Sequence, residues 1–208
     1  MSSSIWSAPK TKQQPTMIGL DEAGVGPALG SMWASAVHIP EEVEIPGLTD
    51  SKKLTEKKRT RLRQEIVATC LYGLGEVTHT EIDTLGLGEC RRLVFERALD
   101  DLFRKHPDMV VDKIVVDGTI FREYRGIPHE CVPKADLTNP HVSAASILAK
   151  TTRDRQVIEL CDVVTDLDAK YGIRSNKGYL GPSHIKGLQE HGFSEYHRTS
   201  YKIKGFNK

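Results

Sequence analysis

Residues 17–39 read MIGLDEAGVGPALGSMWASAVHI, and this stretch decides the fold. It holds two apolar runs, residues 17–20 and 31–39. A segment with several glycines and Pro27 separates them, and Pro40 follows the second run. Two apolar runs joined in this way predict a β-hairpin or two adjacent strands. The first run is followed directly by Asp21 and Glu22, so two carboxylates are expected where the first strand ends.

The rest of the chain alternates between strand-like and helical patterns. Apolar runs favour strands over residues 70–77, 114–116 and 131–132. Apolar residues at helical spacing favour helices over residues 55–68, 88–105, 141–169 and 183–191. Thr55 and Ser183 are expected to cap two of these helices, and Gly192 to end the last one. This order predicts an α/β fold, with a mixed central sheet flanked by helices and a C-terminal helical region.

The composition is that of an ordinary soluble globular protein. The 208 residues include 38% apolar and 27% charged residues, and the formal net charge is +1. We expect residues 1–16 to form a flexible tail and residues 17–208 to form one domain. No apolar run approaches the roughly 18 residues of a membrane-spanning helix, and residues 1–16 lack the apolar core of a signal peptide. A cytoplasmic protein with no membrane partner is expected.

Charge is distributed unevenly along the chain. Residues 169–208 contain eight Lys and Arg against two Glu. A net charge near zero argues against polyanion binding through a bulk positive field, whereas a local basic segment is typical of a groove that follows a phosphate backbone. The cysteines include no C-x-x-C pair and are expected to be reduced thiols rather than zinc ligands; they are Cys70, Cys90, Cys131 and Cys161.

Four acidic residues lie at or near the ends of predicted strands. Asp21 and Glu22 follow the first apolar run, Asp117 follows the buried run, and Asp136 precedes the long helix. Ligands of α/β sheets bind outside the carboxyl ends of the strands, and clustered carboxylates call for a hard divalent cation such as Mg²⁺. Each residue taken singly fits an ordinary turn. Neighbours on a regular strand point to opposite faces, so Asp21 and Glu22 share a site only if the strand ends or bulges there.

Six sequence motifs resemble, in the same order, those of type 2 ribonuclease H, the ribonuclease HII family. A single short match would be weak, whereas six in order across residues 17–201 are highly specific. They are DEAGVGP at 21–27, DSKKL at 50–54, VDG at 116–118, KAD at 134–136 with SAASILAK at 143–150 and TRD at 152–154, NKGY at 176–179 with His184, and HRTSY at 197–201.

The resemblance implies a fold and an activity. It implies an RNase H-like fold and an endonuclease that needs Mg²⁺ or Mn²⁺, bound at a two-metal site. The expected substrates are RNA in RNA–DNA hybrids and single ribonucleotides embedded in duplex DNA, with 5′-phosphate and 3′-hydroxyl products. By motif, the catalytic and metal-binding residues are Asp21, Glu22, Asp117 and Asp136. Asp21 is expected to bind both ions, Asp136 the ion on the nucleophile side, and Asp117 with Glu22 the ion on the leaving-group side.

The resemblance also implies residues that bind the substrate. Discrimination of RNA from DNA at one position requires contact with the 2′-hydroxyl, which the family assigns to the backbone at Gly24, Val25 and Gly26 and to Tyr179. Val25 departs from the family pattern, which has arginine there, and an arginine contact is therefore lost. The expected phosphate contacts are Lys52, Lys177 and Arg198, while His184 and His197 are expected to have structural hydrogen-bonding roles.

Two alternatives remain open at the level of sequence. The first is a ribonuclease HIII-like nuclease that cleaves hybrids only; the short stretch of residues 1–16 before the first predicted strand argues against the extra domain of that branch. The second is a weakened hybrid-binding protein, because Val25 replaces the family arginine. Residues 202–208 contain no obvious clamp-binding peptide, and a monomer is expected.

Overall fold

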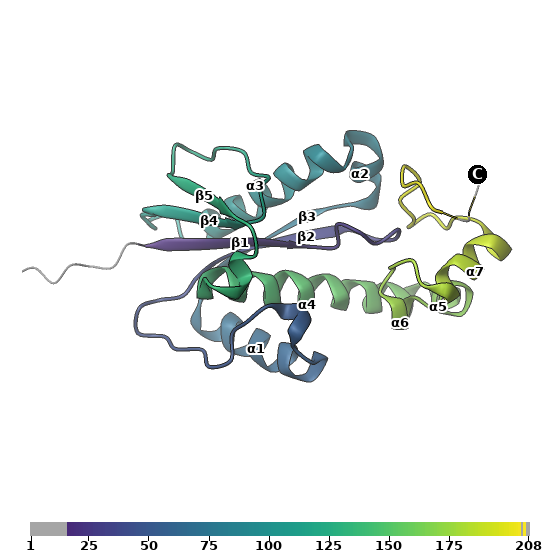
Figure 1. Ribbon diagram of the computed structural model, residues 1–208, viewed down its shortest axis with the longest axis horizontal. Helices are drawn as coiled ribbons and strands as arrows, with labels where there is room; N and C mark the ends of the chain where they lie inside the picture. Colours follow the sequence, from purple (N-terminus) through teal and green to yellow (C-terminus); the bar gives the residue numbers. More distant parts are fainter. Residues whose placement is uncertain (1–15, 205, 207–208) are drawn as a thin grey trace, which may run out of the picture.

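The computed structural model describes residues 16–204 and 206, and its centre is a five-stranded sheet in the order β3-β2-β1-β4-β5 (Figure 1). β2 is antiparallel to β1 and β3, while β1, β4 and β5 run parallel. The predicted pair of adjacent strands and the mixed sheet are therefore confirmed. The strands are β1 (Met17–Ala23), β2 (Met32–His38), β3 (Leu71–Val77), β4 (Lys113–Asp117) and β5 (His129–Val132).

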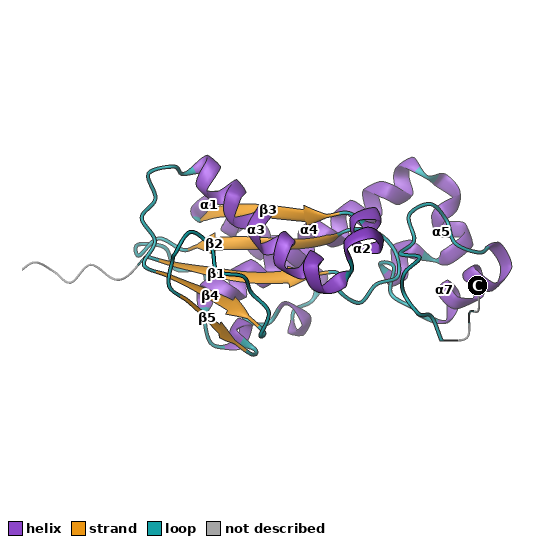
Figure 2. Cartoon of the chain, turned by 90° about the horizontal axis from the view of Figure 1, so that it is seen from above, coloured by secondary structure: helices purple, strands orange, loops and turns teal. Residues whose placement is uncertain are grey.

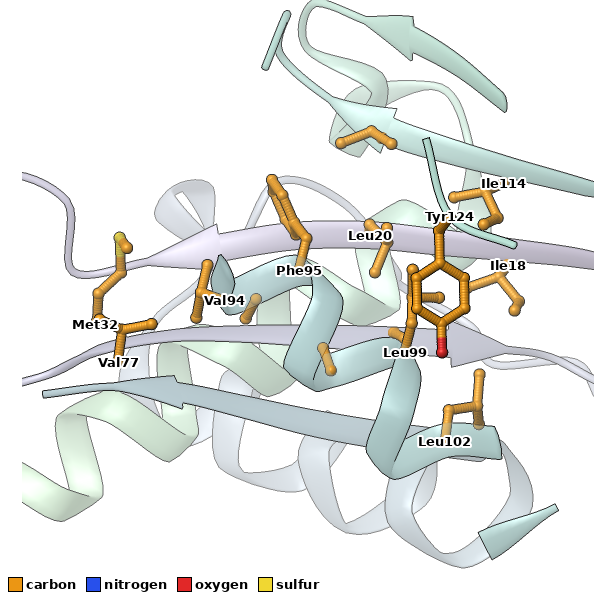
Figure 3. Packing of buried hydrophobic residues seen from close by; sticks show 14 of the residues in the cluster. Ile18, Leu20, Met32, Val77, Val94, Phe95, Leu99, Leu102, Ile114 and Tyr124 are labelled. Atoms are coloured by element: carbon orange, nitrogen blue, oxygen red, sulfur yellow. The ribbon is translucent and has the colours of Figure 1, made fainter. Parts of the chain in front are cut away.

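Helices cover both faces of this sheet, as predicted. α3 (Leu87–Lys105) packs on one face, while α4 (Pro140–Val163) packs on the other with α1 (Glu56–Thr69) against it (Figures 1 and 2). Side chains alternate along β1, because successive residues of a strand point to opposite faces. Ile18 and Leu20 point toward α3 and contribute to an apolar core that includes Phe95 (Figure 3).

Glycines bring the two large helices unusually close to the sheet. A Cβ on Gly19 would lie 2.2 Å from the carbonyl carbon of His141, in the first turn of α4. A Cβ on Gly73 or Gly75 would lie 2.2 Å from carbonyl oxygens of α3. These distances are far below a van der Waals contact, so the helices approach the strands backbone to backbone only because the side chains are absent.

The C-terminal helical region lies beyond one end of the sheet and has its own apolar core (Figure 1). Ala28 and Leu29, from the loop after β1, belong to this core. The Ala28 amide donates to the Gly178 carbonyl at 2.9 Å, and the Arg198 amide donates to the Ala28 carbonyl at 2.8 Å. The loop after β1 is thus joined to the C-terminal region; the helices there are α5 (Thr165–Tyr171), α6 (Ile173–Asn176) and α7 (Pro182–His191).

The structure differs from the sequence predictions at three boundaries. β1 does not end before Asp21 but continues to Ala23, because its last residues still pair with β2. The α7 helix begins at Pro182 with Gly181 as its N-cap, so the predicted cap at Ser183 is wrong; proline suits the first helical position because its missing N–H has no partner there. The pattern over residues 141–169 is divided into α4 and α5.

Other predictions concern the ends and the smaller elements. The predicted tail lies outside the described residues except for Thr16. Thr55 caps α1 and Gly192 follows α7, both as predicted. Among the described residues, no helix combines the length and apolar character needed to cross a membrane. The remaining elements are α2 (His79–Leu85) and two single 3₁₀ turns, η1 (Ser51–Lys53) and η2 (Ala135–Leu137).

Candidate active site

Asp21 and Asp117 lie side by side where the parallel pairing of β1 with β4 ends. Each follows the last paired residue of the ladder that joins β1 to β4. Asp136 lies in η2, the turn that leads from β5 to α4, and is buried. The Ala135 amide in the same turn donates to Asp117 Oδ1 at 2.8 Å, which holds η2 against the end of β4. Topology therefore brings these three carboxylates to one edge of the sheet.

Glu22 reaches this edge from the other face of β1. The strand is regular, so Asp21 points toward α4 and Glu22 points toward α3. The Glu22 carboxylate accepts from Arg91 Nε at 3.0 Å and also pairs with Arg91 Nη2. Both acidic side chains nevertheless border the same pocket. Sharing a pocket thus requires neither a bulge nor an early end of the strand.

Arg91 was not expected from the sequence. It lies on α3 three residues before Val94 and seven before Ala98, on a stripe that is otherwise apolar. A single charged residue within an apolar helical stripe is the signal that indicates it. Its guanidinium is the cation that contacts Glu22 directly.

Burial and mutual repulsion raise the pKa of three of the carboxyl groups. Burial is the largest cause that raises the pKa of Asp21, and the charges of Glu22 and Asp117 raise it further. A hydrogen bond from Ser146 acts in the opposite direction. Burial also raises the pKa of Glu22, although Arg91 opposes the shift. The pKa of Asp136 is raised by burial, by Asp117 and by Asp50, with Lys52 acting in the opposite direction. The edge carries more negative charge than the neighbouring cations neutralise.

The donor set fits a hard divalent cation in kind and in charge. Carboxylate oxygens are the ligands that Mg²⁺ and Mn²⁺ prefer, and an added cation would relieve the repulsion that raises these pKa values. Within residues 16–204 and 206, no three carboxylate, imidazole or thiol groups are already grouped so as to hold an ion. The fit therefore rests on the ligand type and on the uncompensated charge.

Asp21, Glu22 and Asp117 border an open pocket of about 430 Å³, whereas Asp136 is buried and is not part of its lining. It brings together most of the residues predicted to bind substrate: the loop after β1, the η1 turn and Tyr179, which comes from the distant C-terminal region. A Cβ on Gly26 would lie 3.8 Å from the Tyr179 ring, which is 43% exposed. The lining residues are Asp21, Glu22, Ala23, Gly24, Val25, Gly26, Ser51, Lys52, Asp117, Ser146, Lys150 and Tyr179.

Gly24 cannot be replaced without strain. Its φ of +89° lies in the region that favours glycine, and a Cβ would lie 3.0 Å from Arg153 Nε and 3.1 Å from the Ser31 carbonyl oxygen. Gly26 has an ordinary φ and is exposed to the pocket. The two glycines therefore act differently: the first permits the turn, and the second leaves the backbone accessible.

Ser51, Ser146 and Lys150 line the pocket without having been singled out from the sequence. The Oγ atoms of Ser146 and Ser51 lie within hydrogen-bond distance at 2.9 Å, which links α4 to η1 beside Asp21. Lys150 Nζ lies 5.4 Å from the centre of the Tyr179 ring. All three belong to the motifs at 50–54 and 143–150, which are the sequence signal for them.

Two predicted phosphate contacts lie outside this pocket. Lys177 has a left-handed backbone with φ 51°, and its ammonium group binds the Arg174 carbonyl. It borders a separate groove of about 300 Å³ between α1 and α4, together with Arg59, Arg63 and Arg155. Lys177 is therefore not brought to the carboxylates.

Arg198 differs more sharply from the expectation, because its side chain is fully buried. Nε donates to the Gly30 carbonyl at 2.9 Å, Nη1 to Val25 at 3.0 Å and Nη2 to Gly24 at 2.7 Å. The expected direct phosphate contact at Arg198 is corrected: its donors are engaged with the carbonyl groups of the loop after β1. Arg198 supports that loop from within.

Comparison with known proteins gives consistent results. A family model described as Ribonuclease HII matches residues 18–204. The chain is similar to curated proteins named Ribonuclease HII from Cytophaga hutchinsonii, at 37% identity over 89% of each chain, and Acinetobacter baylyi, at 40% identity over 88% of this chain and 93% of that protein. It also resembles the crystal structure of the ribonuclease H2 from Pyrococcus horikoshii OT3, with a TM-score of 0.73 and 27% identity over 90% of this chain and 94% of that one.

Proposed function

The chain belongs to the ribonuclease HII family and is a type 2 ribonuclease H, a nuclease of RNA–DNA hybrids, and we propose that it also cleaves at single ribonucleotides in duplex DNA by a two-metal-ion mechanism. The observation that supports this proposal best is one pocket that joins carboxylates from two parallel strands to an accessible glycine backbone and an exposed tyrosine. Hydrolysis requires the carboxylates of these strands, and recognition of the ribose requires the glycine backbone and Tyr179; all of them border this pocket.

Four residues would hold the metal ions: Asp21, Glu22, Asp117 and Asp136. Asp21 is the most central, since it lies between Glu22 on its own strand and Asp117 on the next, and we assign it to both ions. Asp136 would contact the ion on the nucleophile side, and Asp117 with Glu22 the ion on the leaving-group side. Bound Mg²⁺ or Mn²⁺ would supply positive charge to the phosphate and lower the pKa of the attacking water.

The protein groups around the carboxylates orient the substrate. The backbone at Gly24, Val25 and Gly26 is proposed to contact the ribose 2′-hydroxyl, because only an RNA residue offers that group. The ring of Tyr179 is proposed to stack on the adjoining deoxyribose. Lys52 lies at the pocket and is proposed to contact the phosphate, whereas Lys177 would reach only phosphates farther along the duplex.

A cleavage assay tests the proposed function. A duplex with one embedded ribonucleotide and a full RNA–DNA hybrid would be compared with Mg²⁺ and then with Mn²⁺. We expect both substrates to be cleaved, with 5′-phosphate and 3′-hydroxyl ends. Cleavage of the hybrid alone would instead indicate a ribonuclease HIII-like activity, and binding without cleavage of either would indicate a weakened hybrid-binding protein.

Replacement of Tyr179 by alanine should reduce cleavage of the single-ribonucleotide duplex at least as much as cleavage of the hybrid. Stacking of an aromatic ring contributes about 1–3 kcal/mol, and a single ribonucleotide has no neighbouring ribonucleotides to compensate for its loss. The kcat/KM values for both substrates measure this effect, with Leu180→Ala as a control at the next exposed position. A larger loss on the hybrid would contradict the proposed role.

Replacement of Val25 by arginine should strengthen duplex binding. Val25 is half-buried at the pocket, and an arginine there would add a cation where the family has one. One additional phosphate contact should steepen the dependence of log affinity on log salt by about one unit. Binding titrations at several salt concentrations measure this slope, and Val25→Met separates added length from added charge. An unchanged slope would show that the missing arginine does not limit binding.

A further inference from the structure

Two buried histidines, His184 and His197, contact each other next to the main chain of Tyr179. Neither has a part in the chemistry proposed above. His184 is in the first turn of α7, and His197 is in the loop that follows this helix. Their exposed fractions are 0% and 1%, and their Nε2 atoms lie 2.9 Å apart. Two facing ring nitrogens at this distance share one proton, so one ring donates and the other accepts.

The hydrogen bonds at both ends determine which ring donates. His184 Nδ1 lies 3.0 Å from the Tyr179 carbonyl oxygen, which can only accept, so Nδ1 carries the proton and Nε2 of the same ring is an acceptor. His197 Nε2 must then donate to it. His197 Nδ1 in turn accepts from the Ser194 amide at 2.9 Å and from Ser194 Oγ at 2.7 Å. The bonds form one continuous chain from Ser194 to Tyr179.

The surroundings keep both rings neutral. Burial lowers the pKa of His197 to about 4, with His184 and His79 adding repulsion, and burial also lowers the pKa of His184. Tyr171 packs its ring edge-on against both, at 5.9 Å from His184 and 4.8 Å from His197. Each ring therefore has one donor and one acceptor near neutral pH, as the chain of bonds requires.

This chain is anchored to the loop that carries the pocket glycines. The Gly30 amide donates to the Tyr196 carbonyl at 3.0 Å, and Arg198 binds the carbonyls of Gly24 and Val25. His197 and Arg198 are adjacent in sequence and contact the two sides of the pocket. His197 is linked to the Tyr179 carbonyl through His184, and Arg198 donates to the carbonyls of the glycine loop.

We propose that His184 and His197 are positioning residues that hold the main chain of Tyr179 at a set distance from the glycine backbone across the pocket. The inference rests on the proposed function, since it concerns the two elements assigned to ribose recognition. The Tyr179 carbonyl also accepts from the Gly181 amide at 2.9 Å. The Tyr179 amide donates to the Asn176 carbonyl at 3.0 Å. These bonds fix the backbone locally, while the histidine chain connects it to the opposite wall.

The tautomers can be tested in the wild-type protein without any substitution. Long-range ¹H–¹⁵N correlation spectra near pH 7 should show His184 protonated at Nδ1 and His197 protonated at Nε2. His184 protonated at Nε2, or either ring charged at this pH, would overturn the proposal. This result does not depend on whether the protein cleaves any substrate, so failure of the proposed function would be recognised separately.

A matched pair of variants tests the link to Tyr179. His184→Asn places an amide near the position of Nδ1 and keeps a donor for the Tyr179 carbonyl, whereas His184→Gln places its amide near Nε2 and withdraws that donor. Both lose one of the two bonds and the ring, so their thermal stabilities should fall alike. The kcat/KM for the single-ribonucleotide duplex should be about fivefold lower in His184→Gln than in His184→Asn, as expected for one neutral hydrogen bond.

A double-mutant cycle then separates positioning from a general structural effect. The readout is the ratio of kcat/KM for the single-ribonucleotide duplex to kcat/KM for the hybrid, here called the discrimination. If His184 acts through Tyr179, adding His184→Gln to Tyr179→Ala should change this ratio little further. Additive effects, or equal effects of His184→Gln and His184→Asn, would overturn the proposal. His191→Gln is the control, because His191 is on the same helix and also contacts Tyr171 but lies outside the chain of bonds. It should leave the discrimination unchanged.

Discussion

Asp21→Asn should reduce turnover on an RNA–DNA hybrid by about a thousandfold or more while the protein still folds. The change removes the charge that is proposed to contact both ions, and losses of this size are typical when a group that stabilises developing charge is removed. The amide has the same shape, and its oxygen can still accept from the Glu22 amide, which donates to Asp21 Oδ1 at 2.7 Å. Asp136→Asn should also abolish cleavage.

The same substitution should stabilise the metal-free protein at neutral pH. Burial raises the pKa of Asp21 in the folded state, so the stabilising contribution of this group is present at acid pH and is lost as the pH rises through the raised pKa. An uncharged asparagine avoids the cost of burying the charge. In a chelator, Asp21→Asn should therefore melt above the wild type, and Mg²⁺ should raise the melting temperature of the wild type more than that of the variant.

Steady-state cleavage rates and thermal melts with and without Mg²⁺ measure these effects. Asp108→Asn is a suitable control, since Asp108 is an exposed aspartate after α3 and lies outside the lining of the pocket. Wild-type rates in Asp21→Asn or Asp136→Asn would remove the two-metal assignment. A metal-free variant that melts below the wild type would contradict the account of the buried charge.

Arg198→Met should lower the free energy of unfolding by about 3–5 kcal/mol. The guanidinium donates to the carbonyl groups of Gly24, Val25 and Gly30 and to Tyr201 Oη at 2.9 Å, and of these carbonyls only that of Val25 has a further side-chain donor among the described residues, Tyr201 Oη at 2.6 Å. A buried acceptor that loses its partner costs about 1–3 kcal/mol, and methionine replaces none of these bonds. The free energy of unfolding of Arg198→Lys should lie between those of the wild type and Arg198→Met, because a single ammonium group cannot donate to three carbonyl groups at once as the guanidinium does.

Urea unfolding monitored by circular dichroism measures this loss, and cleavage assays well below the melting temperature show whether the folded variant keeps its pocket. Arg104→Met is the control: its side chain is 71% exposed and pairs with Asp101 on the helix surface, so its effect should stay within about 0.5 kcal/mol. A loss of less than about 1 kcal/mol in Arg198→Met would show that the loop carbonyls find other donors.

The elements that the sequence predicted depend on local pattern. Two apolar runs separated by glycines sufficed for β1 and β2, and three consecutive apolar residues sufficed for β4, because such runs have few alternatives in a packed sheet. The end of β1 could not be predicted in this way. Whether Asp21 and Glu22 stay in the strand depends on their pairing with β2, which lies across the hairpin and is invisible in the run itself.

The sequence motifs identified carboxylates that the fold places together, whereas the expected position of Arg198 was wrong because the sequence does not show burial. The carboxylates of β1 and β4 meet at one pocket because strand ends in a parallel pair share an edge. Arg198 lies in a basic segment, where arginines are usually solvated, yet here the carbonyls of a tight loop require its donors. Arg91 and the orientation of His184 depend on contacts between segments distant in sequence, which no local pattern contains.

Gly19 has a consequence for how freely this protein can change its core. Gly19 lies two residues before Asp21, and the main chain of α4 that it meets begins four residues after Asp136. The spacing between these two carboxylate-bearing segments is thus set where backbone meets backbone, with no side chain between them. Any side chain at Gly19 would push the start of α4 away from β1 and would separate Asp136 from Asp21. This position therefore accepts only glycine, and it controls the carboxylate geometry although it carries no functional group of its own.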